Sequence, residues 1–303
     1  MAQLEYIDAK TIISEYKAEN PWFGAHYNMN IYKGCNHGCI YCDSRSECYQ
    51  VEDFDRVRAK ANALTLIERD LKSKTKKGIV GSGSMSDPYN PFEKELALTR
   101  GALALIHRYG FGVCLFTKSD LIVRDIDILC EISHHSPVLA AITITTSDDG
   151  LSKKIEQNVS VSSARFKAVK ALSDAGLFAG VLLMPVLPFI EDTPENIKSL
   201  VKMAYEHNAK FIYTHPQFGV TLRSNQRDWF YDKLDLLYPG LKEKYIKAFG
   251  NNYECASLKS KQLWSIFTQE CDRYGILYRM EDIIKTTQNG YGVHQISLFD
   301  LSV

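Results

Sequence analysis

The chain has 303 residues, of which 45% are apolar and 24% charged, a composition typical of globular proteins that excludes disordered and fibrous classes. Its 36 basic and 36 acidic side chains cancel, so no overall field draws the protein to nucleic acid or to an anionic membrane. The first residues are charged where a signal peptide would be apolar, and the longest apolar stretch, 179–190, is too short to span a bilayer. We therefore expect a cytoplasmic protein with no membrane partner, in which cysteines seldom form disulfides.

Apolar runs alternate with helical patterns along most of the chain. After an N-terminal segment, residues 1–26, a strand at 26–32 runs into a cysteine-rich loop, and residues 55–72 have the apolar spacing of a helix. Further strands are predicted at 78–84, 111–118, 138–146, 178–185 and 210–215. The helices predicted between them lie at 93–109, 123–132, 162–175 and 194–208.

This alternation predicts an α/β fold, a partial (β/α)6 TIM-like barrel over residues 27–220. Strands rich in Val, Ile and Leu, separated by single helices, indicate a parallel sheet buried on both faces. Six such units are fewer than the eight of a closed barrel. Beyond about residue 221 the alternation ends and aromatic, helical segments follow. We therefore predict a C-terminal helical extension, residues 221–303, and not a second domain.

The cysteine-rich loop reads KGCNHGCIYC over residues 33–42. Its three cysteines are Cys35, Cys39 and Cys42. A four-iron cluster has four corners, so three thiolates leave one iron open to bind a substrate or cofactor. Zinc is the alternative, with His37 or Cys48 completing a four-ligand site, although the second ligand pair that usually marks a structural zinc site does not follow. The loop comes after the first strand, at the strand end where barrel folds place their chemistry.

The stretch CNHGCIYC resembles the C-x3-C-x2-C motif of the radical S-adenosylmethionine (SAM) enzymes, including an aromatic residue, Tyr41, before the third cysteine. The resemblance implies that Cys35, Cys39 and Cys42 hold three irons of a 4Fe-4S cluster and that SAM chelates the fourth. It also implies that one-electron reduction cleaves SAM to methionine and a 5′-deoxyadenosyl radical, which abstracts a hydrogen atom from substrate. The implied partner is a reductant such as flavodoxin or ferredoxin.

Residues 81–100 and 116–129 resemble the spore photoproduct lyase-like branch of that superfamily, often labelled DNA repair photolyase-like. By this resemblance, the positions that contact SAM are Tyr41, Ser84, Ser86, Lys118, Thr143 and Arg165. Arg165 resembles a basic residue aimed at the methionine carboxylate. Hydroxyl groups and a cation are also what a zwitterionic cofactor with ribose hydroxyls requires. Asp87 and Pro88 are expected to open a turn that shapes the cofactor pocket.

One position departs from the branch and bears on the substrate. The lyase has a cysteine after the second strand as hydrogen-atom donor, where this sequence has Ser84. An O–H bond is stronger than an S–H bond, so Ser84 argues against photoproduct lyase activity, as does the neutral charge balance against DNA. The substrate stays open between a thymine lesion in DNA and another small or macromolecular substrate. The alternative function is a non-catalytic iron–sulfur or zinc-binding protein.

Overall fold

The computed structural model describes residues 4–16, 22–83 and 85–291, and its main sheet has seven strands. From one edge, the parallel strands are β10 (Ile212–Tyr213), β9 (Phe178–Leu182), β8 (Val138–Thr143), β7 (Gly112–Thr117), β6 (Ile79–Ser82) and β3 (Tyr27–Met29). Antiparallel β2 (Ile13–Glu15) pairs with β3 at the other edge. Six parallel strands in this open order confirm the predicted α/β partial barrel.

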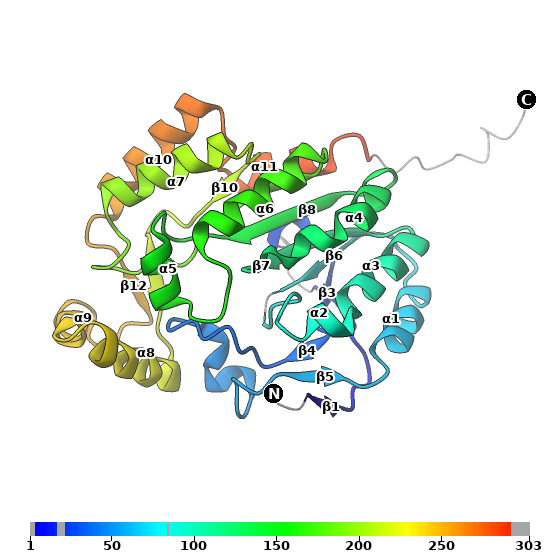
Figure 1. Ribbon diagram of the computed structural model, residues 1–303, viewed down its shortest axis with the longest axis horizontal. Coiled ribbons are helices and arrows are strands. Elements are labelled where there is room, and N and C mark those ends of the chain that lie inside the picture. The colour runs from blue at the N-terminus through cyan, green and yellow to red at the C-terminus, as the bar shows by residue number, and fades with distance from the viewer. Residues whose placement is uncertain (1–3, 17–21, 84, 292–303) are drawn as a thin grey trace, which may run out of the picture.

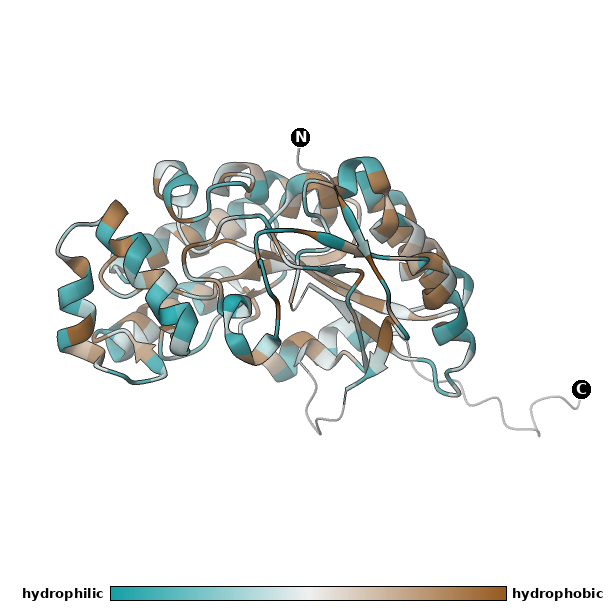
Figure 2. Ribbon diagram, turned by 90° about the horizontal axis from the view of Figure 1, so that it is seen from below, coloured by the Kyte–Doolittle hydropathy of each residue, from teal (hydrophilic) through white to brown (hydrophobic). Residues whose placement is uncertain are grey.

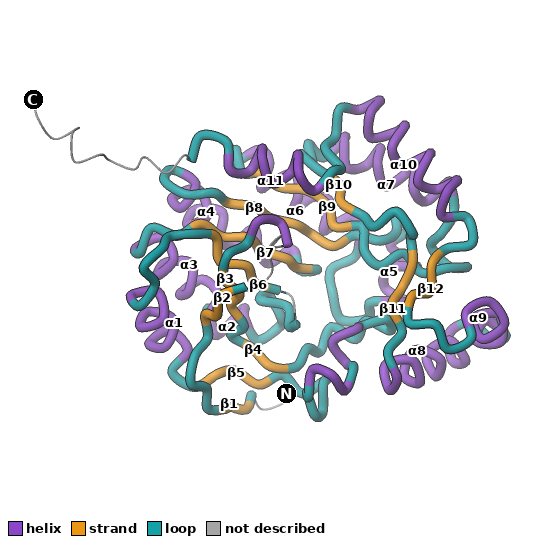
Figure 3. The backbone as a smooth tube through the Cα atoms, turned by 180° about the vertical axis from the view of Figure 1, so that it is seen from behind, coloured by secondary structure: helices purple, strands orange, loops and turns teal. Residues whose placement is uncertain are grey.

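Helices cover the outer face of this sheet. They are α1 (Ala63–Lys72), α3 (Leu98–Arg108), α4 (Ile126–Ser133), α6 (Ser162–Asp174) and α7 (Pro194–Glu206). Figure 1 views the molecule from the helix side, and Figure 3 shows the strands from behind. The helices turn hydrophobic residues towards the sheet and hydrophilic ones outwards (Figure 2), as expected of amphipathic helices on a core.

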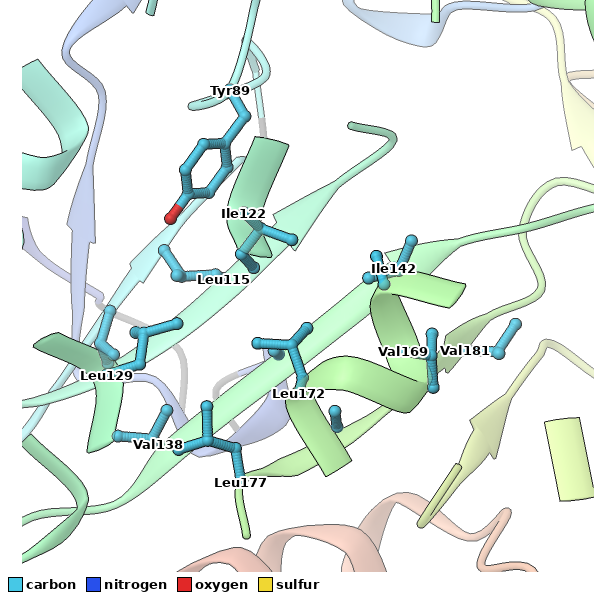
Figure 4. Close-up of a cluster of buried hydrophobic side chains, with 14 of the residues drawn as sticks. Tyr89, Leu115, Ile122, Leu129, Val138, Ile142, Val169, Leu172, Leu177 and Val181 are labelled. Carbon is cyan, nitrogen blue, oxygen red and sulfur yellow. The ribbon is translucent and has the colours of Figure 1, made fainter. Parts of the chain in front are cut away.

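The strands bury both faces, with side chains alternating between them. On β7, Leu115 packs on the helix side, whereas Cys114 and Phe116 belong to a separate cluster on the inner side. Figure 4 shows Leu115 close to other members of the outer cluster, including Leu172 of α6 and Leu129 of α4. The outer cluster thus joins the strands to the helices that separate them in sequence.

Aromatic rings close the inner face of the open barrel. The ring of Phe23, in the short helix η1 (Trp22–Gly24), lies 5.3 Å from that of Phe116 and 5.8 Å from that of Phe211, measured between centroids. The final helix, α11 (Met280–Gln288), adds Ile283 to the same cluster. The barrel interior is therefore packed, and the chemistry must lie at the carboxyl ends of the strands.

The region between the first two barrel strands differs from the prediction. The strand expected at 26–32 divides into β3 and β4 (Tyr32–Lys33), and the helix expected at 55–72 is α1 preceded by β5 (Arg58–Lys60). Strand β5 pairs with β4 and with β1 (Glu5–Ile7) in a separate three-stranded sheet. Pairing with segments distant in sequence outweighs the local helical spacing here.

Two other helices were predicted with the wrong limits. The helix expected at 93–109 is broken into α2 (Glu93–Leu96) and α3 at Ala97, whose φ is 49°. The Glu93 carboxylate accepts from the Thr99 backbone N–H at 3.0 Å and so restarts the second helix. The helix expected at 123–132 starts as a 3-10 turn, η4 (Asp120–Asp125), before α4. Helix α5 (Asp149–Ile155) was not predicted.

The C-terminal extension packs on the barrel. Its helices before α11 are α8 (Ser224–Leu237), α9 (Leu241–Phe249) and α10 (Ser260–Tyr274). Helix α10 packs against α7, and its Phe267 belongs to the outer cluster of the barrel. The sequence did not predict that β11 (Gly219–Thr221) pairs with β12 (Glu254–Ala256). The proposed limits 27–220 and 221–303 stay a prediction, and β11 crosses that boundary.

Among the described residues, no helix has both the length and the apolar character needed to cross a membrane.

If the extension shares its core with the barrel, Phe267→Ala should destabilise the whole protein. The Phe267 side chain is fully buried, and removing such a side chain costs about 3–5 kcal/mol. Leu258, which is 70% exposed, supplies the control Leu258→Ala, with an expected change within about 0.5 kcal/mol. Denaturant unfolding should show one weakened transition for Phe267→Ala. A separate early transition, with the barrel unaffected, would contradict the shared core.

Candidate functional site

The cysteine loop starts with a turn that only glycine fits. Gly34 has φ +80°, and a Cβ there would lie 2.6 Å from the Arg56 carbonyl oxygen and 2.7 Å from that of Phe54. The next residue, Cys35, donates its backbone N–H to the Phe54 carbonyl at 2.8 Å. Ser86 donates its hydroxyl to the Gly34 carbonyl at 2.6 Å. The loop is thus pressed between the segment before β5 and the turn after β6.

The end of α5 and the segment that follows it hold the other side of the loop. Ile40 donates its backbone N–H to the Ile155 carbonyl at 3.0 Å, and the Asn158 N–H donates to the His37 carbonyl at 3.0 Å. The Asn158 side chain donates to the Asn36 carbonyl at 2.9 Å. These bonds fix the backbone of the loop, and none of them uses a thiol.

The three thiols line one cavity of about 630 Å³. Of the residues predicted to contact SAM, Tyr41, Ser86 and Lys118 line the same cavity. Its volume is in the range of small-molecule sites. Within the described part of the chain, no three His, Cys, Asp or Glu side chains are grouped to hold a single metal ion. A four-iron cluster is larger than one ion, and three thiols around a common cavity are a donor set that fits it.

Burial and charge have opposite effects on these thiols. Burial raises the pKa of Cys35 to about 12, and it also raises the pKa values of Cys39 and Cys42. The Lys118 cation opposes this shift at Cys39 and Cys42. Metals bind thiolates, so loading the site would release protons from these cysteines, and Lys118 favours that release.

Asp87 connects the loop to two strand ends. One oxygen of this buried carboxylate accepts from the Tyr89 N–H at 2.8 Å and from the Thr117 hydroxyl at 2.6 Å. The other accepts from the Lys118 backbone N–H at 2.8 Å and lies 3.5 Å from His37 Nδ1. The expected turn at Asp87 is therefore present, and the carboxylate also positions Lys118 and His37.

Glu156 forms a second buried centre, on the opposite side of the loop. It accepts hydrogen bonds from the Tyr41 hydroxyl and from Arg165, the latter at 2.5 Å. Burial alone would raise the pKa of Glu156, but Arg165 and Lys118 outweigh burial and hold this pKa below its usual value. The Tyr41 ring, which lies 5.6 Å from Lys118 Nζ, is therefore held against the cavity by an ionised carboxylate.

Arg165 is fully buried and its donors are taken by protein groups. Besides Glu156, it donates to the carbonyls of Ser160 at 2.6 Å and Thr143 at 2.8 Å. Arg165 does not line the cysteine cavity, whereas Lys118 does. The contact predicted between Arg165 and the methionine carboxylate stays a prediction, and Lys118 is the cation that faces the cavity.

The remaining predicted contacts lie at neighbouring strand ends. Thr143 lines a smaller cavity of about 270 Å³, which shares Asp87 and Lys118 with the cysteine cavity. Ser84 lies outside the described residues. The structure thus brings the three cysteines together with Tyr41, Ser86 and Lys118 around one cavity, and Thr143 lines the neighbouring cavity.

The two side chains considered as a fourth metal ligand behave differently. Cys48 is exposed, its sulfur lies 3.2 Å from the Ser46 hydroxyl oxygen, and it does not line the cysteine cavity. His37 lines the cavity but faces Asp87. Within the described residues, three thiols therefore share one cavity, and Cys48, the next cysteine along the chain, lies outside it.

No pattern in the sequence indicates the part that Glu156 plays. It stands in a charged stretch, KKIEQN, that reads as a solvated helix end. Asp87 has a weak local signal, because an Asp-Pro pair directly after a predicted strand marks a turn at a barrel mouth. Both roles depend on contacts with the cysteine loop that are distant in sequence: Asp87 faces His37, and Glu156 accepts from Tyr41.

Comparison with known proteins gives matches to one family. The Radical SAM superfamily model matches residues 29–204. An uncharacterized protein of Mycobacterium tuberculosis is 29% identical over 230 residues, covering 74% of this chain and 67% of the relative. An uncharacterized protein of Methanocaldococcus jannaschii is 32% identical over 194 residues, covering 61% of this chain and 72% of the relative.

Among solved structures, the fold is similar to spore photoproduct lyase. Its complex with dinucleoside spore photoproduct gives a TM-score of 0.65 at 14% identity, covering 91% of this chain and 81% of the other. A variant of that lyase with bound AdoMet gives a TM-score of 0.62 at 13% identity, covering 84% and 76%. These likenesses confirm the predicted fold, a partial barrel like that of spore photoproduct lyase.

The turn at Gly34 should be essential for the metal site. In Gly34→Ala the new methyl group meets two backbone carbonyls, so the loop must shift, and we expect iron content after anaerobic reconstitution to fall by more than half. Gly176→Ala is the matched control, because Gly176 also has a positive φ, +85°, but nothing within 4 Å of its Cβ position. The control carries only the left-handed strain of about 1 kcal/mol. Equal iron loading in both variants would contradict a rigid loop.

Glu191, in the loop after β9, should make stability depend on pH. Burial raises its pKa from 4.5 to about 8. The native state therefore binds a proton that the unfolded state has lost, and the free energy of unfolding falls as pH rises from about 5 to about 8. Glu191→Gln has no carboxyl group to titrate and so avoids this fall in the free energy of unfolding. The melting temperature of the variant should therefore exceed that of the wild type by a margin that grows as pH rises to about 8. The exposed Glu243 of α9 supplies the control Glu243→Gln. A constant difference across this pH range would show that Glu191 is not protonated in the native state.

Proposed function

Because this chain belongs to the radical SAM superfamily, we propose that it binds a 4Fe-4S cluster through Cys35, Cys39 and Cys42 and uses it to cleave SAM. When bound, the cluster and SAM supply a one-electron cleavage that gives a 5′-deoxyadenosyl radical for hydrogen abstraction from a substrate. The observation that carries the proposal is the set of three thiols around a single cavity, with Cys48 outside it.

The chain's own residues would bind and orient the cofactor in this cavity. Lys118 is the cation that faces it, and its charge suits the carboxylate of SAM. Burial alone would lower the pKa of Lys118, but Cys39, Glu156 and Cys42 raise it above its usual value, so the ammonium group stays charged. Tyr41 presents a ring that Glu156 holds in place, which supports a stacking role beside the cofactor.

The substrate is proposed only as a class. Similarity in fold to spore photoproduct lyase favours a lesion in DNA, whereas Ser84 argues against the lyase outcome because serine is a poor hydrogen-atom donor. We therefore propose hydrogen abstraction as the function and leave lesion repair as one candidate for its use.

The direct test is formation of 5′-deoxyadenosine from SAM by anaerobically reconstituted protein with dithionite. We expect the wild type to form it, and single Ala substitutions of Cys35, Cys39 or Cys42 to lower the rate at least about 100-fold, since each removes an iron ligand. Cys48→Ala is the matched control and should keep the wild-type rate.

Two results would overturn the proposal. The first is no 5′-deoxyadenosine from wild-type protein that carries iron and sulfide, which would favour the non-catalytic iron–sulfur protein. The second is loss of the cluster in Cys48→Ala, which would place a fourth protein ligand on the iron intended for SAM.

A further inference from the structure

A second cavity, of about 770 Å³, lies beside the cysteine loop and is separate from the proposed SAM site. The turn after β6, the start of η4 and the segment after α5 form its walls. Most of its lining is polar or charged, and the uncharged polar residues include Asn90, Ser119, Gln157 and Asn158. The larger of the two cavities is therefore a polar groove that the proposed function does not use.

His37 is the one described residue that lines both this groove and the cysteine cavity. It stands midway between Cys35 and Cys39 in the chain, and it is 3% exposed. Its ring faces Asp87 Oδ2 at 3.5 Å, and its carbonyl accepts from Asn158, which lines the groove. A molecule seated in the groove would thus be separated from the cysteine cavity by a fixed, buried imidazole.

The groove carries two cations that the protein does not neutralise. Lys94 of α2 and Lys153 of α5 are exposed in its lining, and no ion pair joins either to a carboxylate within the described residues. Arg124 also lines the groove, but it is paired with Glu93 at 2.8 Å and with Asp125 at 2.7 Å, both buried. The one acidic residue of the lining, Asp120, accepts from the Ser160 hydroxyl at 2.6 Å. Among the described residues, the two lysines outside any ion pair therefore outnumber the one carboxylate of the lining.

We propose that this groove is the docking surface for an acidic one-electron carrier protein, which passes its electron to the cluster past His37. The inference rests on the proposed function, which needs an external electron. One electron passes from the redox centre of the carrier to the cluster. The carrier is thereby oxidised and the cluster reduced, and no bond is made or broken. Exposed cations around a polar groove suit a partner with surface carboxylates, since such charges steer association and fix orientation.

The test uses reconstituted holoenzyme, a reduced flavodoxin as the carrier, and the double variant Lys94→Glu/Lys153→Glu. At low salt, we expect flavodoxin to bind the variant at least about tenfold more weakly and to reduce its cluster at least about tenfold more slowly in stopped-flow measurements. Both differences should shrink near 0.5 M salt, where the Debye length is only about 4 Å. Dithionite, a small reductant that needs no docking surface, should reduce both proteins at the same rate.

The matched control is Lys198→Glu/Lys261→Glu, which makes the same change in net charge with exposed lysines of α7 and α10, outside the groove. We expect it to bind flavodoxin within about twofold of the wild type. Equal losses in the two double variants would mean that net charge, and not this groove, governs the encounter, and would overturn the proposal.

Two further arms separate the remaining outcomes. The docking surface is overturned if Lys94→Glu/Lys153→Glu binds flavodoxin as tightly as the wild type does. It is also overturned if this variant loses affinity for a short DNA duplex while its affinity for flavodoxin stays unchanged. If the wild type forms no 5′-deoxyadenosine with dithionite, the proposed function fails, but the affinity for flavodoxin still reports on the groove.

Discussion

The carboxylate of Asp87 is the interaction on which the site depends. It joins the turn after β6, through Tyr89, to the end of β7, through Thr117 and Lys118, and it faces His37 of the cysteine loop. A buried carboxylate needs several donors, because an unpaired charge in the interior is costly. The requirement works in both directions: the donors satisfy the buried oxygens of Asp87, and Asp87 keeps the loop and two strand ends in one arrangement.

The cysteine loop depends equally on segments that are late in the chain. Glu156 and Arg165 hold Tyr41 from the side of α5 and α6. On α8, the Gln226 side chain donates to the Tyr41 carbonyl at 3.1 Å. Residues of the loop and of α8 and α9 also share one hydrophobic cluster, which includes Ile40, Tyr41, Phe230 and Tyr245. The C-terminal extension therefore supports the cysteine loop and is not an appendage.

The parts of this fold that the sequence predicted are those with a local cause. Parallel strands such as β7 and β8 are continuous apolar runs, and α7 has a Thr193 cap followed by Pro194, so their patterns are complete within a few residues. Strand β5 and the β11–β12 pair exist only through partners far along the chain, which no local pattern encodes.

The same distinction applies to the site. The cysteine spacing is a local motif, because one loop must carry all three thiols, and it was predicted. Glu156 and Asp87 act across the fold, and only the structure shows that they hold Tyr41 and His37.

The open iron corner of the proposed cluster requires a loop that supplies no fourth ligand, and the hydrogen bonds of this loop meet that requirement. Its backbone is fixed to three separate segments, at Phe54, Ile155 and Ser86, so a small shift of the loop cannot bring a further side chain to the three thiols. His37, the nearest alternative donor, is held by Asp87 on one side and by Asn158 on the other. Rigidity here is thus a condition of the chemistry, since a mobile loop would let His37 or Cys48 close the position that a cofactor must occupy.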